Sequence, residues 1–258
     1  EERGLKIVRS ADDGPDAVLQ GFFQDVTWHD LSEAALAIRA GALYIATNLD
    51  LVIPRERGLM VGNGALVGAV SLSTGVKPIS GGKPEPEIFL AAARGLDSRK
   101  PLAIGDNLDT DIKGAVSAGI DCLHVLTGLA SARNICLAPP EVRPTFLCDD
   151  MRGLNEPYPE VLIETGDEHS RQAGDERIDD GEDIDSGDVA KAGTVTVGSA
   201  QARWTESGVR LFGEKEIDVA AGPTLNLDEY RALVHAAWKA ADAGADLDAA
   251  VGEITVVR

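Results

Sequence analysis

The sequence predicts an α/β fold, and three observations support this prediction. Short apolar runs without polar alternation, which are typical of buried parallel strands, recur along the first 150 residues. Segments with apolar residues at helical spacing lie between them, and glycine or polar turn residues mark their ends. With 258 residues and 44% hydrophobic content, the chain is long enough to bury a core in one or two domains.

The elements expected before residue 80 alternate between strands and helices. Thr27 and Asp30 have the spacing of a capping box, so a helix is expected to begin there and to continue until Gly41. A second helix is expected to begin within Gly62-Asn63-Gly64. The apolar runs that indicate strands lie at residues 5–8, 17–23 and 43–46.

The same alternation continues from residue 78 onward. Lys83 follows a short strand at 78–80 and opens a helix marked by Pro84 and Pro86, because proline is tolerated in the first helical turn. A buried strand is expected at 101–104 and a helix at 112–118, closed by Gly119. Later strands are expected at 122–126 and 145–148, with a short helix and a proline-rich turn between them.

Three carboxylates crowd one turn directly after the strand at 101–104, namely those of Asp106, Asp109 and Asp111. They repel one another unless a cation or a base offsets their charge, and hard oxygen ligands of this kind suit Mg²⁺. Open α/β sheets bind ligands at the carboxyl ends of their strands, where Asp106 is expected. One helix and one strand separate Lys83 from Asp106, so a right-handed crossover brings both residues to the same sheet edge. The sequence therefore predicts an anion site at Lys83 beside a cation site at Asp106.

These stretches together resemble the third and fourth motifs of the haloacid-dehalogenase (HAD) phosphatases. The two motifs are Gly82-Lys83-Pro84-Glu85-Pro86 and Gly105-Asp106-Asn107-Leu108-Asp109-Thr110-Asp111-Ile112. Upstream segments resemble the cap of the nitrophenyl-phosphatase-like, phosphoglycolate and pyridoxal-phosphate phosphatases. These segments are Ala46-Thr47-Asn48-Leu49-Asp50, Pro54, Glu56-Arg57-Gly58-Leu59 and Gly62-Asn63-Gly64-Ala65-Leu66.

The resemblance, which covers roughly Pro15 to Leu129, implies a partial HAD Rossmann-like core with an α/β C2-type cap. Residues 1–79 would form the later part of the cap, and residues 80–155 the second half of the core. The family's D-x-D-G-T motif, which carries the nucleophilic aspartate on the first core strand, is not visible in the sequence. We therefore expect a truncated product of a longer protein, inactive by itself.

The resemblance also implies roles for individual residues. Lys83 would contact the phosphate, Asp111 would orient Lys83 or metal-bound water, and Asp106 would bind Mg²⁺. The expected function is Mg²⁺-dependent hydrolysis of a small phosphomonoester of the glycerol 3-phosphate or phosphoglycolate class. The alternative is a catalytically dead binding or scaffold module derived from such a phosphatase. The residues expected to bind the substrate are Asn48, Asp50, Ile53 and Lys83.

A nicotinamide-binding oxidoreductase is a third hypothesis, which rests on the glycine-rich stretch at residues 62–68 alone. The third glycine of this stretch is one residue late for a dinucleotide fingerprint. No acidic residue ends a following strand at the expected distance. We therefore interpret the stretch as the beginning of a helix in the cap.

The net charge of −19 opposes binding to nucleic acid or to an anionic membrane surface.

Residues 156–188 contain 13 acidic and 2 basic residues and few large apolar groups, so residues 156–190 are predicted to be an acidic linker. Residues 191–258 predict a small α+β domain, in which a helix at 228–241 places Tyr230 and Trp238 in the core. This domain weakly resembles the acetyltransferase-like domain of some phosphatases of this subfamily.

Cysteine content and hydropathy indicate the cellular compartment in which the protein is expected. Cys122, Cys136 and Cys148 are odd in number and lack C-x-x-C spacing, which favours buried or free thiols in a cytoplasmic protein. No apolar run approaches the roughly 20 residues that span a bilayer, so no membrane association is expected. The expected partner is a small phosphorylated metabolite, and a homodimer is left open.

Overall fold

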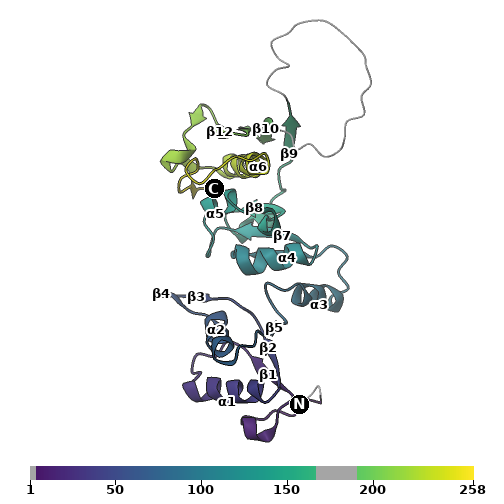
Figure 1. Cartoon of the computed structure of the whole chain (residues 1–258). Coiled ribbons are helices and arrows are strands. Elements are labelled where there is room, and N and C mark those ends of the chain that lie inside the picture. Colours follow the sequence, from purple (N-terminus) through teal and green to yellow (C-terminus); the bar gives the residue numbers. More distant parts are fainter. Residues whose placement is uncertain (1–3, 167–190) are drawn as a thin grey trace, which may run out of the picture. The chain divides into compact units, whose positions relative to one another are not determined.

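The computed structural model describes residues 4–166 and 191–258 (Figure 1). The chain divides into two compact units, Glu1–Cys122 and Leu123–Arg258, and each is described by itself. Among the described residues, no helix is both long and apolar enough to cross a membrane. The domain boundaries expected from the sequence, after residues 79, 155 and 190, stay predictions.

The first unit contains a three-stranded parallel sheet with the order β1-β2-β5 (Figure 1). Two helices contribute to the core on one face of this sheet. Tyr44 and Ala46 of β2 pack there with Ile38 of α1 and with Val67 and Val70 of α2. The elements are η1 (Ala11–Asp13), β1 (Ala17–Gln20), α1 (Trp28–Arg39), β2 (Leu43–Ala46), α2 (Asn63–Thr74) and β5 (Ile79–Ser80).

Both helices begin where the sequence predicts, for different physical reasons. Thr27 and Asp30 form the expected capping box, in which each side chain accepts the backbone N–H of the other residue. At α2 the reason is close backbone approach: a Cβ at Gly62 would overlap the Asp50 carbonyl, and one at Gly64 would overlap Leu49. The glycine-rich stretch is therefore the packed start of a helix, as interpreted from the sequence.

A β-hairpin that the sequence did not predict lies between β2 and α2. It consists of β3 (Val52–Arg55) and β4 (Gly58–Val61), joined by the two-residue turn Glu56-Arg57. In the part of the chain that the structure describes, these two strands form a sheet of their own.

The remaining elements of the first unit surround a second small core, in which Ile112, Ala115 and Cys122 pack against Phe89. The expected helix after the acidic residues begins earlier than predicted, with a π-helical turn. The helix expected to open at Lys83 begins four residues later, at Glu87, with Pro86 as its N-cap. These elements are α3 (Glu87–Gly95), β6 (Leu102–Gly105), the π-helical η2 (Leu108–Ile112) and α4 (Lys113–Ser117).

The described part of the second unit contains three sets of paired strands. Strands β7 and β8 form one parallel pair, β14 and β15 form another, and five antiparallel strands form a sheet with the order β13-β12-β11-β10-β9. The first elements are β7 (Asp121–Val125), α5 (Ala132–Cys136), η3 (Pro140–Val142), β8 (Phe146–Cys148) and η4 (Met151–Asn155). The later elements are β9 (Val161–Thr165), β10 (Ala192–Val197), β11 (Ala200–Thr205), β12 (Gly208–Phe212), β13 (Glu216–Ile217), η6 (Val219–Ala221), β14 (Thr224–Leu225), α6 (Leu227–Asp242) and β15 (Thr255–Val256).

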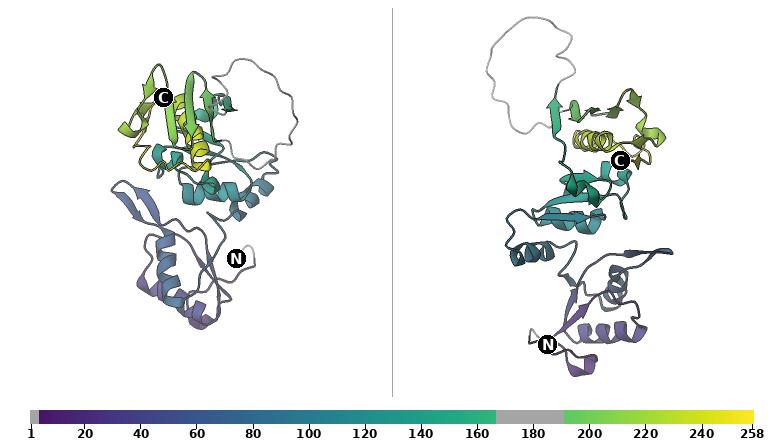
Figure 2. Two further views of the ribbon diagram at one scale, coloured as in Figure 1. Left: turned by 45° about the horizontal axis from the view of Figure 1, so that its top comes forward. Right: turned by 180° about the vertical axis from the view of Figure 1, so that it is seen from behind.

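Helix α6 is the centre of the second unit and is packed on both sides (Figure 2). One side lies against β10, β11 and β12, and the other faces α5. The expected core residues are confirmed, because Tyr230 and Trp238 are both buried. Trp238 also donates its Nε1–H to the carbonyl of Ile135 at 2.8 Å, which links α6 to the end of α5.

One strand prediction was wrong, and the structure has an unexpected strand within the predicted linker. Residues 5–8 form no strand. The predicted acidic linker at 156–190 is interrupted by β9 (Val161–Thr165), which pairs with β10 and completes the antiparallel sheet. Residues 167–190 of that predicted linker lie outside the described part of the chain.

Candidate functional site

Lys83 lies at the carboxyl edge of the parallel sheet, just after β5. The loop that carries it is bound to the loop after β2: Gly81 N–H donates to the Ala46 carbonyl at 3.0 Å, and Leu49 N–H donates to the Lys83 carbonyl at 3.2 Å. A Cβ at Gly82 would overlap the Thr47 carbonyl, so glycine is required for this close approach. Because parallel neighbouring strands end at the same edge, the two loops meet there.

The ammonium of Lys83 lies between one carboxylate from the π-helical turn η2 and another from the loop after β2. Its Nζ is 2.6 Å from Oδ1 of Asp111 and 3.9 Å from Oδ2 of Asp50. The side chain of Asp111 is 13% exposed and that of Lys83 is 34% exposed, so the closer pair is largely sheltered from water. The predicted convergence of Lys83 with the acidic turn is therefore present in the structure.

The balance of forces on Lys83 favours its charged form. Burial acts to lower the pKa of Lys83, but the hydrogen bond to Asp111 and the charges of Asp111, Asp50 and Asp106 outweigh it and raise the pKa above its usual value. The carboxylate of Asp106 is thus among the charges that act on Lys83. The ammonium is a permanent positive charge within an acidic cluster at neutral pH.

The π-helical turn η2 places Asp111 beneath Lys83. Oδ2 of Asp111 accepts the backbone N–H of Asn107 at 3.3 Å, while Oδ1 faces the ammonium. A Cβ at Gly105 would overlap the side chain of Asp111, so β6 must end in glycine for Asp111 to reach this position. Asn107 caps this turn, because its side chain accepts the backbone N–H of Asp109 at 2.9 Å.

Asn48 and Asp50 are held by the first turn of α2. The Asn48 carbonyl accepts a hydrogen bond from Nδ2 of Asn63 at 2.8 Å, and the Asp50 carbonyl accepts the N–H of Gly64, also at 2.8 Å. The side chain of Asn48 accepts the N–H of Asp50 at 3.3 Å, so it shapes the turn itself. These bonds fix the backbone from which the Asp50 carboxylate projects toward Lys83.

Ile53 lies in the β3–β4 hairpin. It is in β3, where it pairs with Met60 of β4, so its backbone belongs to the hairpin. Of the residues expected to bind the substrate, the structure brings Asp50 and Lys83 together, places Asn48 in the supporting turn, and leaves Ile53 in the hairpin.

The described residues do not by themselves form a metal site. Asp106 follows β6 with a carboxylate, which is the ligand chemistry that Mg²⁺ prefers. However, no group of three His, Cys, Asp or Glu side chains within residues 4–166 and 191–258 could hold a metal ion. Asp106 could therefore contribute to a magnesium site but does not form one with its described neighbours.

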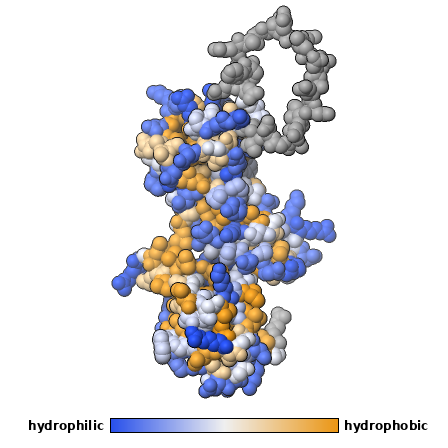
Figure 3. All heavy atoms as spheres, in the orientation of Figure 1, coloured by the Kyte–Doolittle hydropathy of each residue, from blue (hydrophilic) through white to orange (hydrophobic). Residues whose placement is uncertain are grey.

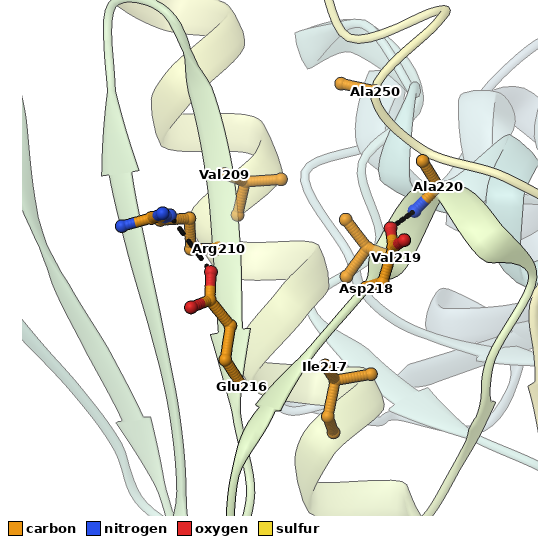
Figure 4. A pocket seen from close by; sticks show the side chains of 8 residues that line it. All are labelled: Val209, Arg210, Glu216, Ile217, Asp218, Val219, Ala220 and Ala250. Atoms are coloured by element: carbon orange, nitrogen blue, oxygen red, sulfur yellow. Dashed lines mark hydrogen bonds and ion pairs between the residues drawn. The ribbon is translucent and has the colours of Figure 1, made fainter.

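A cavity lies in the second unit, and none of the residues that line it was predicted to be functional (Figure 4). Its volume is about 430 Å³, and an ion pair between Arg210 and Glu216, with an N–O distance of 3.0 Å, lies on its wall. The lining residues are Val209, Arg210, Glu216, Ile217, Asp218, Val219, Ala220 and Ala250.

Sequence reasoning missed the residues that support the site. Asn107, Asn63 and Gly105 position Asp111 and the loop of Asp50 without carrying charge themselves. The one available signal was position: Asn107 directly precedes the carboxylate-rich turn, and asparagine is favoured at such caps.

Three comparisons show which known proteins this chain is similar to. Residues 80–154 match a family model described as HAD-hydrolase-like. The chain is 43% identical over 208 residues to a D-glycerol 3-phosphate phosphatase of Mycobacterium tuberculosis, covering 77% of this chain and 59% of that protein. It is 41% identical over 162 residues to an acid sugar phosphatase of Staphylococcus aureus, covering 62% of this chain and 60% of that protein. The chain thus spans about 60% of the length of these curated relatives.

A solved structure supports the same grouping. A glycerol phosphate phosphatase from Mycobacterium tuberculosis in complex with magnesium is 46% identical, with a TM-score of 0.55 over 62% of this chain and 51% of that one. The predicted α/β fold class and the predicted resemblance are both confirmed.

Proposed function

We propose, because residues 80–154 match the HAD-hydrolase-like family model and the chain is 43% identical to a D-glycerol 3-phosphate phosphatase, that it is part of a Mg²⁺-dependent phosphatase that hydrolyses a small phosphomonoester. The observation that supports this proposal best is the position of Lys83 at the sheet edge, paired with Asp111 and close to Asp50. The proposal includes the expectation that the chain is truncated and that the nucleophile lies in the longer protein.

In this proposal Lys83 binds the phosphate and Asp111 positions Lys83. The ammonium is kept charged and is held from below by a largely buried carboxylate, so its outward side is free to meet an anion. Fixed positive charge near the phosphoryl oxygens stabilises the transition state of phosphoryl transfer. Asp111 acts through Lys83 and needs no contact with the substrate.

Mg²⁺ would be held in part by Asp106 and would offset the negative charge that the phosphate brings to the acidic cluster. The need for such a cation follows from the charges in the site. One ammonium faces three carboxylates, those of Asp111, Asp50 and Asp106, so the cluster by itself repels a phosphate dianion.

We further propose that the loop after β2 and the hairpin select the leaving group. Asn48 and Asp50 offer hydrogen-bond acceptors beside Lys83, and Ile53 offers an apolar side chain in the adjacent hairpin. Acceptors close to a phosphate site fit the hydroxyl groups of a small polyol or hydroxy acid. The glycerol 3-phosphate or phosphoglycolate class is therefore proposed as substrate, in keeping with the activity named for the similar proteins.

Two further features complete the proposal. A cytoplasmic location is supported by Cys122, Cys136 and Cys148, which are all buried free thiols. A homodimer is proposed as the assembly.

The test uses the longer protein with its upstream segment restored, and measures phosphate release from glycerol 3-phosphate and phosphoglycolate. We expect activity that requires Mg²⁺ and is lost in Asp106→Ala. Lys83→Met should reduce kcat/KM by roughly 10²- to 10³-fold, the size typical for losing one preorganised charge. Asp109→Asn is the matched control, because Asp109 lies in the same turn and should leave the activity unchanged. Activity that is indifferent to Mg²⁺ and to both substitutions would reject the mechanism.

A catalytically dead binding or scaffold module is the second candidate. It is favoured by the absence of any group of three potential metal-ligating side chains among residues 4–166 and 191–258. Measurements on the longer protein distinguish the two candidate functions. The binding module would bind inorganic phosphate in a titration and release none from either substrate, even with Mg²⁺ present.

A further inference from the structure

The carboxylate of Asp50 differs from that of Asp111, although both lie near Lys83. Asp111 contacts the ammonium at 2.6 Å, is 13% exposed, and accepts the backbone N–H of Asn107 with its second oxygen. The Asp50 carboxylate lies farther from the ammonium, at 3.9 Å, and its side chain is 26% exposed. Within the described residues, no hydrogen bond to the Asp50 side chain accompanies this ion pair. Asp50 is therefore the more accessible and the less compensated of the two acids.

The charges around Lys83 do not cancel. The ammonium supplies one positive charge, and its contact with Asp111 offsets the charge of one carboxylate. The carboxylate of Asp50 remains as an excess negative charge beside the ammonium. Because this pair is separated by 3.9 Å and is partly open to water, its mutual attraction is weaker than that of a direct contact. The negative charge of Asp50 therefore acts on a ligand that binds next to Lys83.

The backbone that carries Asp50 is fixed. Its carbonyl accepts the N–H of Gly64 at 2.8 Å, and Nδ2 of Asn63 donates to the neighbouring Asn48 carbonyl at the same distance. A Cβ at Gly62 would overlap the Asp50 carbonyl, so α2 approaches this turn closely. Because α2 holds the turn, a ligand cannot move Asp50 away by shifting the loop alone.

The β3–β4 hairpin, which follows Asp50 in the chain, is mostly apolar. Its two strands contain one charged residue, Arg55, and hydrophobic surface gathers around the hairpin (Figure 3). The guanidinium of Arg55 lies 5.9 Å from the ring centroid of Phe22, within the range of a cation–π contact. An excess carboxylate beside an apolar hairpin favours a neutral group over a negatively charged one.

We propose that the charge of Asp50 selects the leaving group, so that the site accepts phosphate esters of neutral polyols and rejects esters that carry a second acid group. The inference rests on the proposed function, in which the phosphate binds at Lys83. It separates glycerol 3-phosphate, whose leaving group is neutral, from phosphoglycolate, whose leaving group carries a carboxylate.

The size of the selection follows from Coulomb's law. A carboxylate joined to the phosphate by one carbon atom would lie about 7 Å from that of Asp50, and an effective dielectric constant of about 20 to 80 then gives a roughly 3- to 50-fold loss of binding. A hydroxyl group at the same place instead donates a hydrogen bond to Asp50, and bonds to a charged acceptor are stronger than bonds to a neutral one.

The first test measures kcat/KM of the longer protein for glycerol 3-phosphate and for phosphoglycolate. Asp50→Asn keeps an acceptor oxygen and removes the charge, so the ratio of the two values, glycerol 3-phosphate over phosphoglycolate, should fall about tenfold. Asp109→Asn is the matched control, because it removes the same charge from the η2 turn and should leave the ratio unchanged. Equal ratios in Asp50→Asn and wild type would overturn the proposal while leaving the phosphatase activity in place.

Two further measurements distinguish charge from shape. The wild-type ratio should decrease between about 10 mM and about 1 M salt, because salt screens the repulsion, and the ratio of Asp50→Asn should stay constant. A wild-type ratio that is independent of salt would refute an electrostatic selection. A wild-type preference for phosphoglycolate that is lost in Arg55→Met would assign the selection to the hairpin instead.

Failure of the proposed function is distinguishable from failure of this inference. If the longer protein hydrolyses neither ester with Mg²⁺ present, the proposed function fails, and calorimetric titration with each ester then measures the selection as binding. Wild type should bind glycerol 3-phosphate roughly 3- to 50-fold more tightly than phosphoglycolate, and Asp50→Asn should bind the two about equally. Equal dissociation constants in wild type would refute the inference, and binding of neither ester would refute both.

Discussion

We expect His235 on α6 to make the stability of the second unit depend on pH. Within the described residues, its Nε2 atom is buried without a hydrogen-bond partner, and its ring packs edge-on against Trp238 with 5.2 Å between ring centroids. Burial, assisted by the nearby charge of Lys239, lowers the pKa of His235 to about 4. The folded state therefore holds a neutral imidazole.

The sign and size of the effect follow from linkage. In the unfolded chain a histidine has a pKa of about 6.5, so between pH 6.5 and pH 4 the unfolded state binds more protons. The free energy of unfolding consequently falls as the pH decreases through this window. A difference of about 2.5 pKa units corresponds to about 3 kcal/mol at most, and partial exposure of the side chain reduces the expected loss to about 2 kcal/mol.

His235→Leu removes this titration and isolates its contribution. Urea unfolding followed by tryptophan fluorescence gives the free energy of unfolding at pH 7.5 and at pH 4 for both proteins. Relative to the wild-type chain, the variant should gain about 2 kcal/mol between the two values. His29→Leu, an exposed histidine on α1, is the control and should show no such gain. Identical pH dependence of His235→Leu and wild type would refute the reasoning.

Three further substitutions test particular contacts by urea unfolding. Gly105→Ala introduces a Cβ that overlaps Asp111, and should lower the free energy of unfolding by roughly 1–3 kcal/mol. Arg143→Met removes two hydrogen bonds to the carboxylate of Asp242 at 2.8 and 2.9 Å, and should cost roughly 2–3 kcal/mol. Thr27→Ala removes the capping box of α1 and should cost roughly 0.5–2 kcal/mol.

Two matched controls test whether a loss of stability comes from the named contact or from any substitution of the same residue type. Gly68→Ala meets no atom within 4 Å in the interior of α2 and should raise stability by about 1 kcal/mol, opposite in sign to Gly105→Ala. Arg210→Met breaks an ion pair whose arginine side chain is 70% exposed, and should change stability by less than about 1 kcal/mol. A larger loss for Arg210→Met than for Arg143→Met would contradict the assigned contacts.

Sequence patterns were sufficient where one local rule determines an element. The capping box at Thr27 and Asp30 gave the start of α1, and the apolar run at residues 43–46 gave β2. Lys83 and Asp111 do meet, but not for the reason predicted from the sequence, because β6 is not a strand of the sheet that contains β5. The capping box and the apolar run depend on spacing within a few residues, which a sequence displays.

Sequence patterns failed where tertiary pairing overrides local composition. Residues 161–165 form β9 within an acidic stretch because β10 supplies a partner strand, which composition does not reveal. The hairpin was missed because Pro54 is unusual in a strand and is accommodated here only by its outward position. The π-helical turn at η2 depends on Asn107 and on the missing side chain of Gly105, and neither residue carries a signal for it.

Helix α2 packs closely against the loop that carries Asp50, and this packing couples the position of the carboxylate to that of the helix. Because Gly62 and Gly64 let the first helical turn rest on the backbone at Leu49 and Asp50, this carboxylate cannot shift without the helix. The 12 residues of α2 rise about 1.5 Å each, which gives a stiff rod of about 18 Å. A tilt of α2 would therefore also move the backbone that carries Asp50, and with it the distance between this carboxylate and the ammonium of Lys83.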